Sequence, residues 1–320
     1  MALHKKEGHR SAGRRHKYMM NVLAASLIAI TLVVVFLGYD HQSSQSIGNV
    51  TPAPSVTAKS HAIDFSSIAE QVYPDSGFIL QAKWNGVAKQ LANSGALNLS
   101  FVANSLRNAK EPLTSEELKV LNGTSTSNVT LNSSSALFTL YLLWSLGINN
   151  KNPIISNGPI MNYGGNPYDL ASTGGYDPLG RLQLGNLSII TLNSSEQGMA
   201  EAIASSTYRP CCNNPAMFPD CNHGAAQLGL IELMVSQGRN EPQIYGALKE
   251  FNAFYYTQQY LNVAGLFNYT KNETWAEVPA NEVLGYNFSS ASGYNEVYGI
   301  LINDNALPQT IGGSGGSCST

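Results

Sequence analysis

Three apolar runs in the second half of the chain predict helices. Residues 225–237 are apolar nearly all round, which is typical of a buried helix, and Gly238 follows them. Residues 243–264 predict a second helix that Pro242 opens. Residues 134–146 predict a third, which is also buried and which we expect Gly147 to end. These runs indicate a helix-rich domain.

Shorter elements complete the predicted fold. Helices are expected over residues 82–92 and 115–121, and Thr114 with Glu117 three residues later forms a capping-box pattern at the start of the second. Strands are expected in short apolar segments, over residues 78–80, 187–192 and 296–302. The predicted fold class is therefore α+β, rich in helix.

Residues 157–186 form a long segment rich in glycine and proline. We expect an ordered surface loop. Loops of this length are uncommon in compact domains and are often functional. Asp169 and Asp177 offer oxygen ligands for a hard cation, but the segment lacks the spacing of a calcium loop. A phosphate-binding glycine loop is also missing from the sequence.

The N-terminal pattern predicts a membrane anchor. Residues 1–18 carry six basic residues against one acidic residue, and residues 19–39 are apolar almost throughout. About 20 apolar residues span a bilayer, and the basic flank stays in the cytoplasm. A cleaved signal peptide is the alternative, but its apolar region is usually shorter and ends at a small-residue cleavage site. We therefore expect a single-pass protein of the cell membrane whose main domain lies outside.

The remaining boundaries follow from composition. Residues 40–60 are rich in Ser, Thr and Pro and predict a linker, residues 61–311 predict one extracytoplasmic domain, and residues 312–320 predict a flexible Gly/Ser tail. Glycosylation outside the cell is expected from ten Asn-x-Ser/Thr triplets, at Asn49, Asn98, Asn122, Asn128, Asn132, Asn186, Asn193, Asn268, Asn272 and Asn287.

The charge of the sequence argues against nucleic acid as a partner. Only 12% of the residues are charged, half the usual share. The part of the chain after residue 18 is acidic overall, which argues against nucleic acid as a partner. The membrane, reached through the N-terminal helix, is the one partner that the sequence predicts.

One segment concentrates reactive side chains. Cys211, Cys212 and Cys221 are three of the four cysteines, and His223 lies two residues after Cys221, just before the helix predicted from residue 225. Thiols at a helix N-terminus have a lowered pKa, because the positive end of the helix dipole favours the thiolate. Asn222 is a natural helix cap.

Three interpretations of this Cys/His segment remain open. A disulfide between Cys221 and Cys211 or Cys212 would staple the loop, with Cys318 on the tail taking the remaining thiol. A metal site would use Cys211, Cys212, Cys221 and His223 as ligands for zinc or copper, although the spacing matches no known motif. A redox or nucleophilic thiol is the third interpretation, although the Cys-x-x-Cys spacing is missing.

Glu232 is the only charged residue in the helix predicted over residues 225–237. A buried carboxylate needs a partner, so we expect it either to orient His223 from outside the ligand set or to pair with Arg209 or Arg239. Met217 and Met234 are interpreted as core residues rather than ligands. A hydrolase triad is unsupported, since no Gly-x-Ser-x-Gly elbow occurs.

The leading hypothesis is therefore a membrane-anchored extracytoplasmic protein whose Cys/His loop binds a thiophilic metal or handles thiol redox. The alternative is a glycosylated cell-surface structural or adhesion protein whose cysteines form stapling disulfides. The sequence assigns neither an enzymatic reaction nor a substrate.

Overall fold

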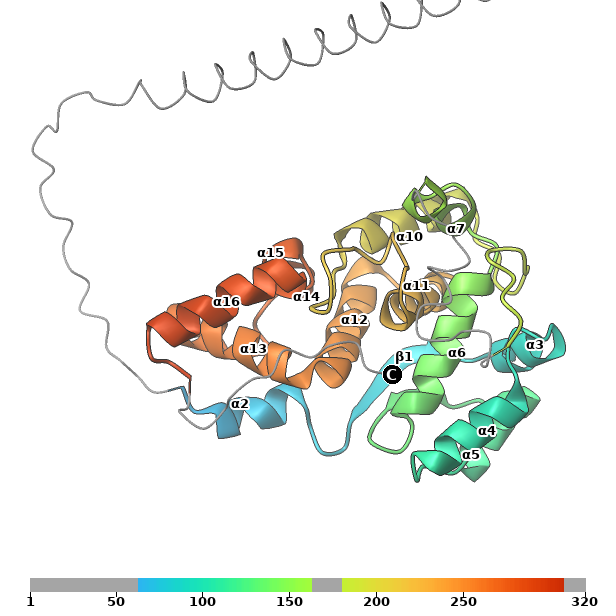
Figure 1. The fold of residues 1–320 in the computed structure, drawn as a ribbon, viewed down its shortest axis with the longest axis horizontal. Helices are drawn as coiled ribbons and strands as arrows, with labels where there is room; N and C mark the ends of the chain where they lie inside the picture. The colour runs from blue at the N-terminus through green and yellow to red at the C-terminus, as the bar shows by residue number, and fades with distance from the viewer. Residues whose placement is uncertain (1–62, 163–179, 308–320) are drawn as a thin grey trace, which may run out of the picture. The chain divides into compact units, whose positions relative to one another are not determined.

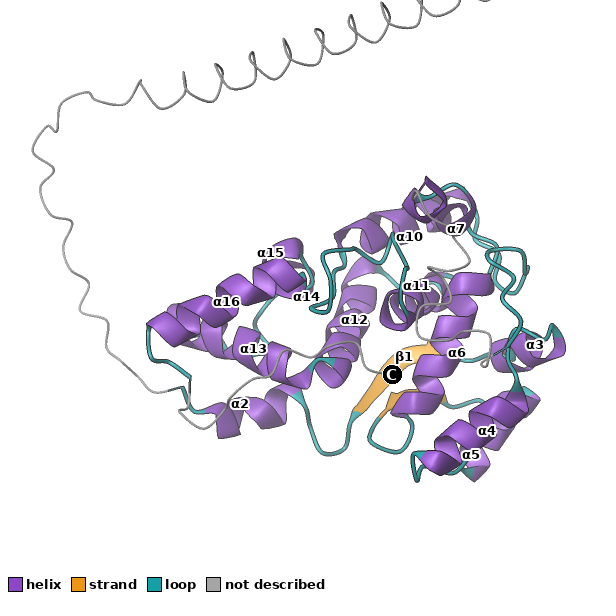
Figure 2. Ribbon diagram, in the orientation of Figure 1, coloured by secondary structure: helices purple, strands orange, loops and turns teal. Residues whose placement is uncertain are grey.

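The computed structural model describes residues 63–162 and 180–307, which are mainly helical (Figure 1). Helices surround a single small sheet (Figure 2). In chain order the elements are α2 (Phe65–Val72), β1 (Phe78–Lys83), α3 (Val87–Asn93), α4 (Leu99–Asn108), α5 (Ser115–Asn122), β2 (Asn128–Leu131), α6 (Ala136–Asn149), α7 (Pro153–Ser156), the 3-10 helix η1 (Pro159–Asn162), α10 (Ser194–Ser206), α11 (Asn222–Val235), α12 (Glu241–Tyr255), α13 (Thr257–Lys271), α14 (Ala280–Val283), α15 (Tyr286–Ser289) and α16 (Ala291–Asn303).

The predicted α+β class is wrong. Within residues 63–162 and 180–307 the only sheet is the antiparallel pair of β1 and β2, with Phe78 opposite Leu131. Residues 187–192 contribute no strand and make one isolated bridge, from Leu187 to Asn150. The structure is better described as an α-helical fold with a small accessory sheet.

The strand predicted over residues 296–302 lies instead inside helix α16. Gly293, Val297 and Leu301 are the buried residues of this helix, and they recur every four positions, as one face of a helix requires. Ser290 caps the helix by accepting a hydrogen bond from the backbone N–H of Gly293 at 2.9 Å. The short apolar stretch suggested a strand, but the buried positions follow the helical period.

The helix over residues 115–121 is confirmed as α5, together with its capping box. Thr114 accepts from the backbone N–H of Glu117, and the Glu117 carboxylate accepts from the backbone N–H of Thr114. The helix predicted over residues 82–92 is only partly correct, because β1 extends to Lys83 and α3 begins at Val87. Between them Gly86 takes a left-handed backbone conformation, with φ of 78°, which ends the extended segment.

The long helix predicted over residues 243–264 is two helices. Tyr256 interrupts it with φ of −127° and ψ of 45°, so α12 ends at Tyr255 and α13 begins at Thr257. The helix predicted over residues 225–237 is present as α11, which starts three residues earlier, at Asn222.

Helices α6 and α11 cross with their backbones in contact. A methyl group on Gly147 would lie 1.9 Å from the backbone oxygen of Ala225, and one on Gly229 would lie 2.2 Å from that of Leu143. Gly147 therefore does not end α6 as predicted, but lies inside it at the crossing. Both helices are buried nearly all round, and they form the centre of the larger hydrophobic core.

A second hydrophobic cluster joins α2, α13 and α16, which lie together on the left of Figure 1. Its centre includes Tyr260 and Phe267, both of which are fully buried. Tyr255, at the end of α12, packs against both clusters. The boundary between α12 and α13 is therefore also the place where the two clusters meet.

Several asparagines of the predicted glycosylation triplets have a structural role. Asn98 and Asn193 are the N-cap residues of α4 and α10, and each side chain accepts a backbone N–H of the first helical turn. Asn132 accepts from the backbone N–H groups of Ser134 and Ser135, next to the start of α6. Asparagine followed by serine is common at helix starts, so these triplets have an explanation besides glycosylation.

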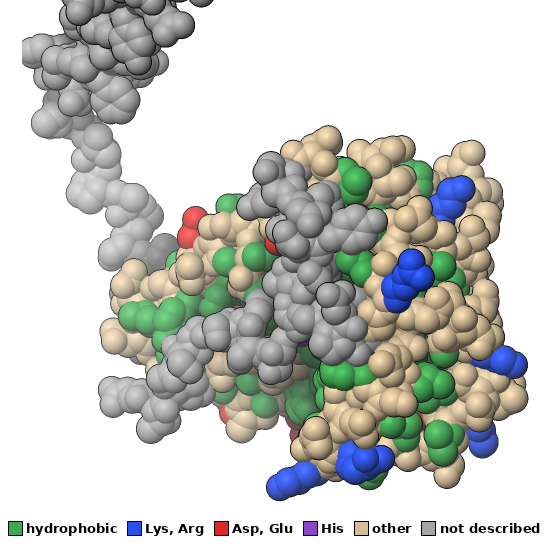
Figure 3. All heavy atoms as spheres, turned by 45° about the vertical axis from the view of Figure 1, so that its right-hand side comes forward, with side chains coloured by type: hydrophobic (Ala, Val, Ile, Leu, Met, Phe, Trp, Pro, Cys, Tyr) green, Lys and Arg blue, Asp and Glu red, His purple; other side chains and the backbone are tan. Residues whose placement is uncertain are grey.

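Surface charge agrees with the low charge of the sequence. On the face shown in Figure 3, the Lys and Arg side chains of the described residues are scattered among uncharged polar and apolar side chains. This distribution gives no sign, on this face, of the basic patch that binding to nucleic acid would require.

Several predictions fall outside the described residues: the anchor over 19–39, the linker over 40–60, the tail over 312–320 and most of the loop over 157–186. Among the residues that the structure describes, no helix has both the length and the apolar character needed to span a bilayer. The membrane localisation remains a prediction.

The helix crossing gives the first testable prediction. Gly147→Ala should lower the free energy of unfolding by on the order of 3 kcal/mol, because the new methyl group would force two backbones apart. Gly246→Ala, inside α12, meets nothing within 4 Å and is the matched control. It should leave stability unchanged or raise it by about 0.5–1 kcal/mol, since alanine is the better helix former. Urea unfolding of both variants tests this, and equal effects would show that the crossing tolerates a side chain.

Candidate functional site

A fully buried arginine organises the loop between α10 and α11. Arg209 has no exposed surface, and its Nη1 donates to the backbone oxygens of Asn214 and Pro215 at 2.9 and 3.2 Å. Its Nη2 donates to the Phe218 oxygen at 3.3 Å and pairs with the Asp220 carboxylate. A buried charge is tolerated only when it is paired and hydrogen-bonded in this way. The loop is therefore folded around one guanidinium group.

The remaining guanidinium nitrogen points at a thiol. Arg209 Nε donates to Cys221 Sγ at 3.2 Å. Cys221 is the N-cap residue of α11, and its sulfur also accepts from the backbone N–H of Gly224 at 3.5 Å. The cap is therefore Cys221 rather than the predicted Asn222. A positive charge and a helix N-terminus both favour the thiolate form of this cysteine.

The other two cysteines lie beside Cys221. Cys211 Sγ is 3.1 Å from the hydroxyl of Tyr256, and the Cys211 thiol is the first cause of the lowered pKa of both Cys212 and Cys221. Cys212 Sγ lies 3.9 Å from the backbone oxygen of Asn214. The structure therefore brings Cys211, Cys212 and Cys221 together, and all three side chains are partly exposed.

The surroundings lower the pKa of two thiols. The hydrogen bond from Cys211 lowers the pKa of Cys221 to about 6; burial opposes the shift, and Arg209 and the Gly224 N–H add to it. The pKa of Cys212 is also lowered, first by the hydrogen bond with Cys211 and then by Arg209. Cys221 is therefore mainly a thiolate at neutral pH.

Backbone contacts fasten the cysteine loop to the C-terminal helices. The Cys212 oxygen accepts from the Ala291 N–H at 2.8 Å, and Asn213 Oδ1 accepts from the Ser292 N–H at 2.9 Å. Both donors belong to the first turn of α16. These contacts attach the cysteine loop to α16, which belongs to the second hydrophobic cluster.

His223 faces aromatic rings. Its ring centroid lies 5.2 Å from that of Tyr255 and 5.1 Å from that of Tyr256, and its Nδ1 is buried with no hydrogen-bond partner among the described residues. Burial and then the charge of Arg209 lower the pKa of His223 to about 4, so the imidazole is neutral. This environment is that of a packing residue at the junction of α12 and α13.

The predicted ligand set Cys211, Cys212, Cys221 and His223 lies in one part of the fold. Among residues 63–162 and 180–307, however, no group of three or more His, Cys, Asp and Glu side chains has an arrangement that could hold a metal ion. The charge on Arg209 also opposes binding of a cation at Cys221. Zinc or copper at these residues stays a prediction.

Glu232 is not part of this site. It lies eleven residues after Cys221 in the same helix, which is roughly 16 Å along the axis. Neither Arg209 nor Arg239 is its partner; Asn152 Nδ2 donates to one carboxylate oxygen at 2.5 Å and Asn150 Nδ2 to the other at 3.2 Å. The predicted role in orienting His223 therefore has no geometric support.

Both asparagines are held in the orientation that Glu232 requires. Asn150 Oδ1 accepts from the backbone N–H groups of Ile189 and Ile190, and Asn152 Oδ1 accepts from that of Ile154. Each amide therefore presents its NH2 group to the carboxylate. Even so, complete burial raises the pKa of Glu232 to about 8, because the two hydrogen bonds only partly offset desolvation.

Sequence reasoning missed three members of the site. Arg209 was considered only as a partner for Glu232, and Asp220 and Tyr256 were not considered at all. Arg209 lies two residues before Cys211, and Asp220 directly precedes Cys221. The available signal was a single arginine and a single acidic residue in a proline-rich loop. Met234 is fully buried and Met217 packs on the core, which agrees with the core role predicted for both.

The sequence matches no known protein family, and neither curated proteins nor solved structures resemble it detectably. The chemistry of the site is therefore argued from its own geometry.

Glu232 gives the second prediction. Its pKa is raised above the unfolded value of 4.5, so its contribution to stability is complete below about pH 4.5 and is lost as pH rises toward 8. The stability of the wild type relative to Glu232→Gln should fall between pH 5 and pH 8, measured by urea unfolding. Glu70→Gln, at an exposed position in α2, is the control and should show no such change. A difference between wild type and Glu232→Gln that stays constant from pH 5 to pH 8 would show that Glu232 is already ionised in the folded protein.

Cys221 gives the third prediction. Because only the thiolate is alkylated, the rate of its reaction with iodoacetamide should rise with pH around a midpoint near 6 and then level off. Peptide mass spectrometry after timed alkylation separates Cys221 from its neighbours. A midpoint above pH 8, the value of an ordinary thiol, would show that Arg209 and the helix N-terminus do not activate it.

Proposed function

We propose that the loop from Arg209 to Gly224 is a thiol redox site, with Cys221 as the nucleophile and Cys211 as its disulfide partner. The observation that carries the proposal is the position of Cys221 Sγ, which lies 3.2 Å from Arg209 Nε and 3.5 Å from the Gly224 nitrogen, next to the Cys211 thiol. A nucleophile held in an electropositive site beside a second thiol is the arrangement that disulfide exchange requires.

The reaction has two steps. The Cys221 thiolate attacks one sulfur of a disulfide-bonded oxidant, which forms a mixed disulfide and releases the other half of the oxidant as a thiolate. Cys211 then loses its proton and attacks Cys221 Sγ, which forms the Cys211–Cys221 disulfide and releases the second half. The two cysteines lose two electrons in total, and the oxidant is reduced to two thiols.

Surrounding residues have separate roles in this scheme. Arg209 is a positioning residue that also stabilises the thiolate, because Asp220 and three backbone oxygens hold the guanidinium in place. Tyr256, whose hydroxyl lies 3.1 Å from Cys211 Sγ, orients the resolving thiol. Cys212 has a lowered pKa and is the thiol that competes for either partner.

A permanent disulfide staple is the second candidate. Cys211 is the first cause of the lowered pKa of Cys221, which indicates that the two thiols are neighbours, and a disulfide between them would lock the loop against α11. The two candidates differ in reduction potential, because structural disulfides resist reduction by glutathione, whereas redox-active ones exchange with it. Both candidates pair Cys211 with Cys221, and they differ in whether this disulfide forms reversibly.

The fourth prediction tests the pairing and its reversibility. Incubation of the reduced protein in glutathione buffers of stepped potential should form a Cys211–Cys221 disulfide, with an equilibrium in the range of the glutathione couple. Tryptic mapping identifies the bond. Cys212→Ser is the matched control and should leave the bond intact, whereas Cys211→Ser should stop the reaction at a mixed disulfide on Cys221.

Three outcomes would contradict the proposal. A disulfide that persists in reduced glutathione would support the staple. Exclusive pairing through Cys212 would assign the resolving role to that residue. Stoichiometric zinc uptake that His223→Phe abolishes would restore the predicted metal site, whereas thiol exchange should tolerate this substitution because the new ring keeps the packing against Tyr255 and Tyr256.

A further inference from the structure

Cys212 is the thiol of the cysteine loop that the proposed exchange leaves over. The exchange joins Cys211 to Cys221, and Cys212, whose pKa is lowered, competes for either of them. Its side chain is partly exposed, and the next residue, Asn213, is exposed. Its Sγ lies 3.9 Å from the backbone oxygen of Asn214, which is a long contact. Cys212 is therefore a thiol near the surface that another sulfur can approach.

The fourth cysteine of the sequence is Cys318, which lies outside the described residues. Because Cys211 and Cys221 pair with each other in the proposed exchange, Cys318 is the partner that the same chain leaves for Cys212. Whether the two can meet depends on where the C-terminal segment, residues 308–318, starts and on how far it reaches.

Helix α16 fixes the start of the C-terminal segment. In its first turn, the Ala291 N–H donates to the backbone oxygen of Cys212 at 2.8 Å. Beyond its other end, the Ala306 N–H donates to the oxygen of Leu301 at 2.8 Å, so the chain turns back toward the helix. Ala291 and Leu301 are about 15 Å apart along the helix axis, at 1.5 Å per residue. The C-terminal segment therefore begins roughly 15–20 Å from the backbone of Cys212.

The length of the C-terminal segment matches this distance. Cys318 follows Leu307 by eleven residues, and residues 312–317 are all Gly or Ser. A Gly/Ser-rich chain of this length has a root-mean-square end-to-end distance of roughly 17–20 Å, and its full extension is about 36–40 Å. A linker whose average length equals the span gives the highest effective concentration, which is in the millimolar range for short flexible linkers.

We propose that Cys318 forms a disulfide with Cys212, which ties the C-terminal segment to the cysteine loop. The inference rests on the proposed function in one respect, namely that Cys211 and Cys221 pair with each other. The new bond removes the competing thiol, so that Cys211 and Cys221 remain as the exchange pair of the loop.

Glutathione disulfide is the oxidant, and the bond forms in two exchange steps. The Cys212 thiolate attacks one sulfur of glutathione disulfide, which forms a mixed disulfide and releases one glutathione as a thiolate. Cys318 then loses its proton to solvent and attacks Cys212 Sγ, which forms the Cys212–Cys318 bond and releases the second glutathione. The two cysteines lose two electrons in total, and the oxidant is reduced to two thiols.

Disulfide mapping of the full chain tests this inference. The reduced protein, oxidised in glutathione buffer and then alkylated, should yield two peptides linked through Cys212 and Cys318. The yield should be equal at ~1 and ~100 µM protein, because the reaction takes place within one chain. Alkylated Cys318 in the oxidised protein, a bond from Cys318 to Cys211 or Cys221, or a disulfide-linked dimer would each overturn the inference.

A shortened C-terminal segment tests the distance argument. Deletion of residues 309–317 leaves the cysteine two residues after Leu307, which limits its reach to ~7 Å, and a disulfide spans at most about 7 Å between Cα atoms. The bond to Cys212 should therefore be lost. Replacement of residues 309–317 by a Gly/Ser sequence of equal length is the matched control and should preserve it. A bond that forms equally well after the deletion would overturn the inference as argued from reach.

The variant Cys318→Ser isolates the effect of the bond on the exchange pair. Cys212 should then compete, so that a Cys212–Cys221 disulfide appears beside the Cys211–Cys221 disulfide of the wild type. Pairing identical to that of the wild type would contradict the role given to the bond.

The mapping also separates this inference from the proposed function. A Cys211–Cys221 disulfide found together with an alkylated Cys318 would support the exchange pair and refute the bond to the C-terminal segment. A Cys212–Cys318 disulfide found together with alkylated Cys211 and Cys221 would support the bond and refute the exchange pair.

Discussion

The close crossing of α6 and α11 is the constraint on which the rest of the described structure depends. Gly147 and Gly229 let the two backbones touch, and a side chain at either position would collide with the opposite helix. This contact fixes where both ends of α11 lie. Its C-terminal part carries Glu232 to the asparagines that follow α6, and its N-terminus points Cys221 at Arg209. One pair of glycines thereby positions two buried polar networks.

The two networks solve the problem of buried charge in different ways. Backbone oxygens, a carboxylate and a sulfur surround Arg209, so each of its three guanidinium nitrogens donates to an acceptor. Glu232 meets only neutral amide donors, and burial therefore raises its pKa to about 8. The first arrangement stabilises the charge of Arg209 and favours the thiolate form of Cys221. The second favours the protonated form of Glu232 inside the core.

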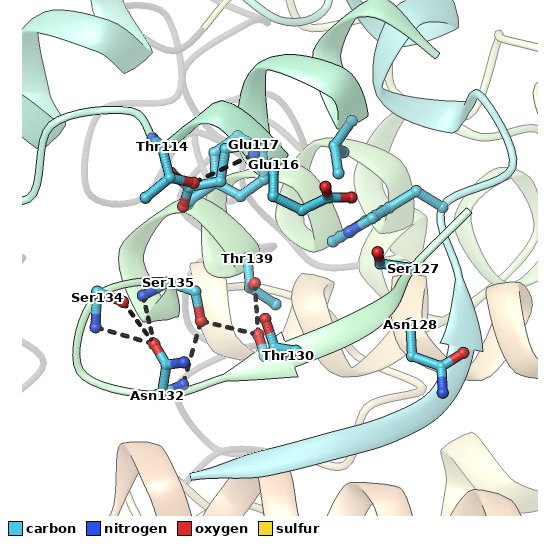
Figure 4. Close-up of a pocket in the computed structure, with 13 residues that line it drawn as sticks. Thr114, Glu116, Glu117, Ser127, Asn128, Thr130, Asn132, Ser134, Ser135 and Thr139 are labelled. Atoms are coloured by element: carbon cyan, nitrogen blue, oxygen red, sulfur yellow. Dashed lines mark hydrogen bonds between the residues drawn. The ribbon is translucent and has the colours of Figure 1, made fainter. Parts of the chain in front are cut away.

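Local patterns predicted those parts of the fold that depend on neighbours in sequence. The capping box at Thr114 and Glu117 requires only residues three apart, and it was predicted correctly (Figure 4). The strand expected over residues 296–302 was wrong because a short apolar run fits either a strand or a buried helix, and the buried positions Gly293, Val297 and Leu301 have helical spacing. Gly147 was read as a helix end, because the sequence does not reveal that another helix passes within contact distance.

The sequence by itself determined that Cys211, Cys212, Cys221 and His223 share one loop before a helix, because nearness along the chain guarantees nearness in space. Only the tertiary structure decided which groups surround these side chains. It placed Arg209 Nε beside Cys221 Sγ, turned His223 toward Tyr255 and Tyr256, and brought two asparagine amides to Glu232. Charge, burial and hydrogen-bond partners come from residues far apart in the chain, and packing alone brings them together.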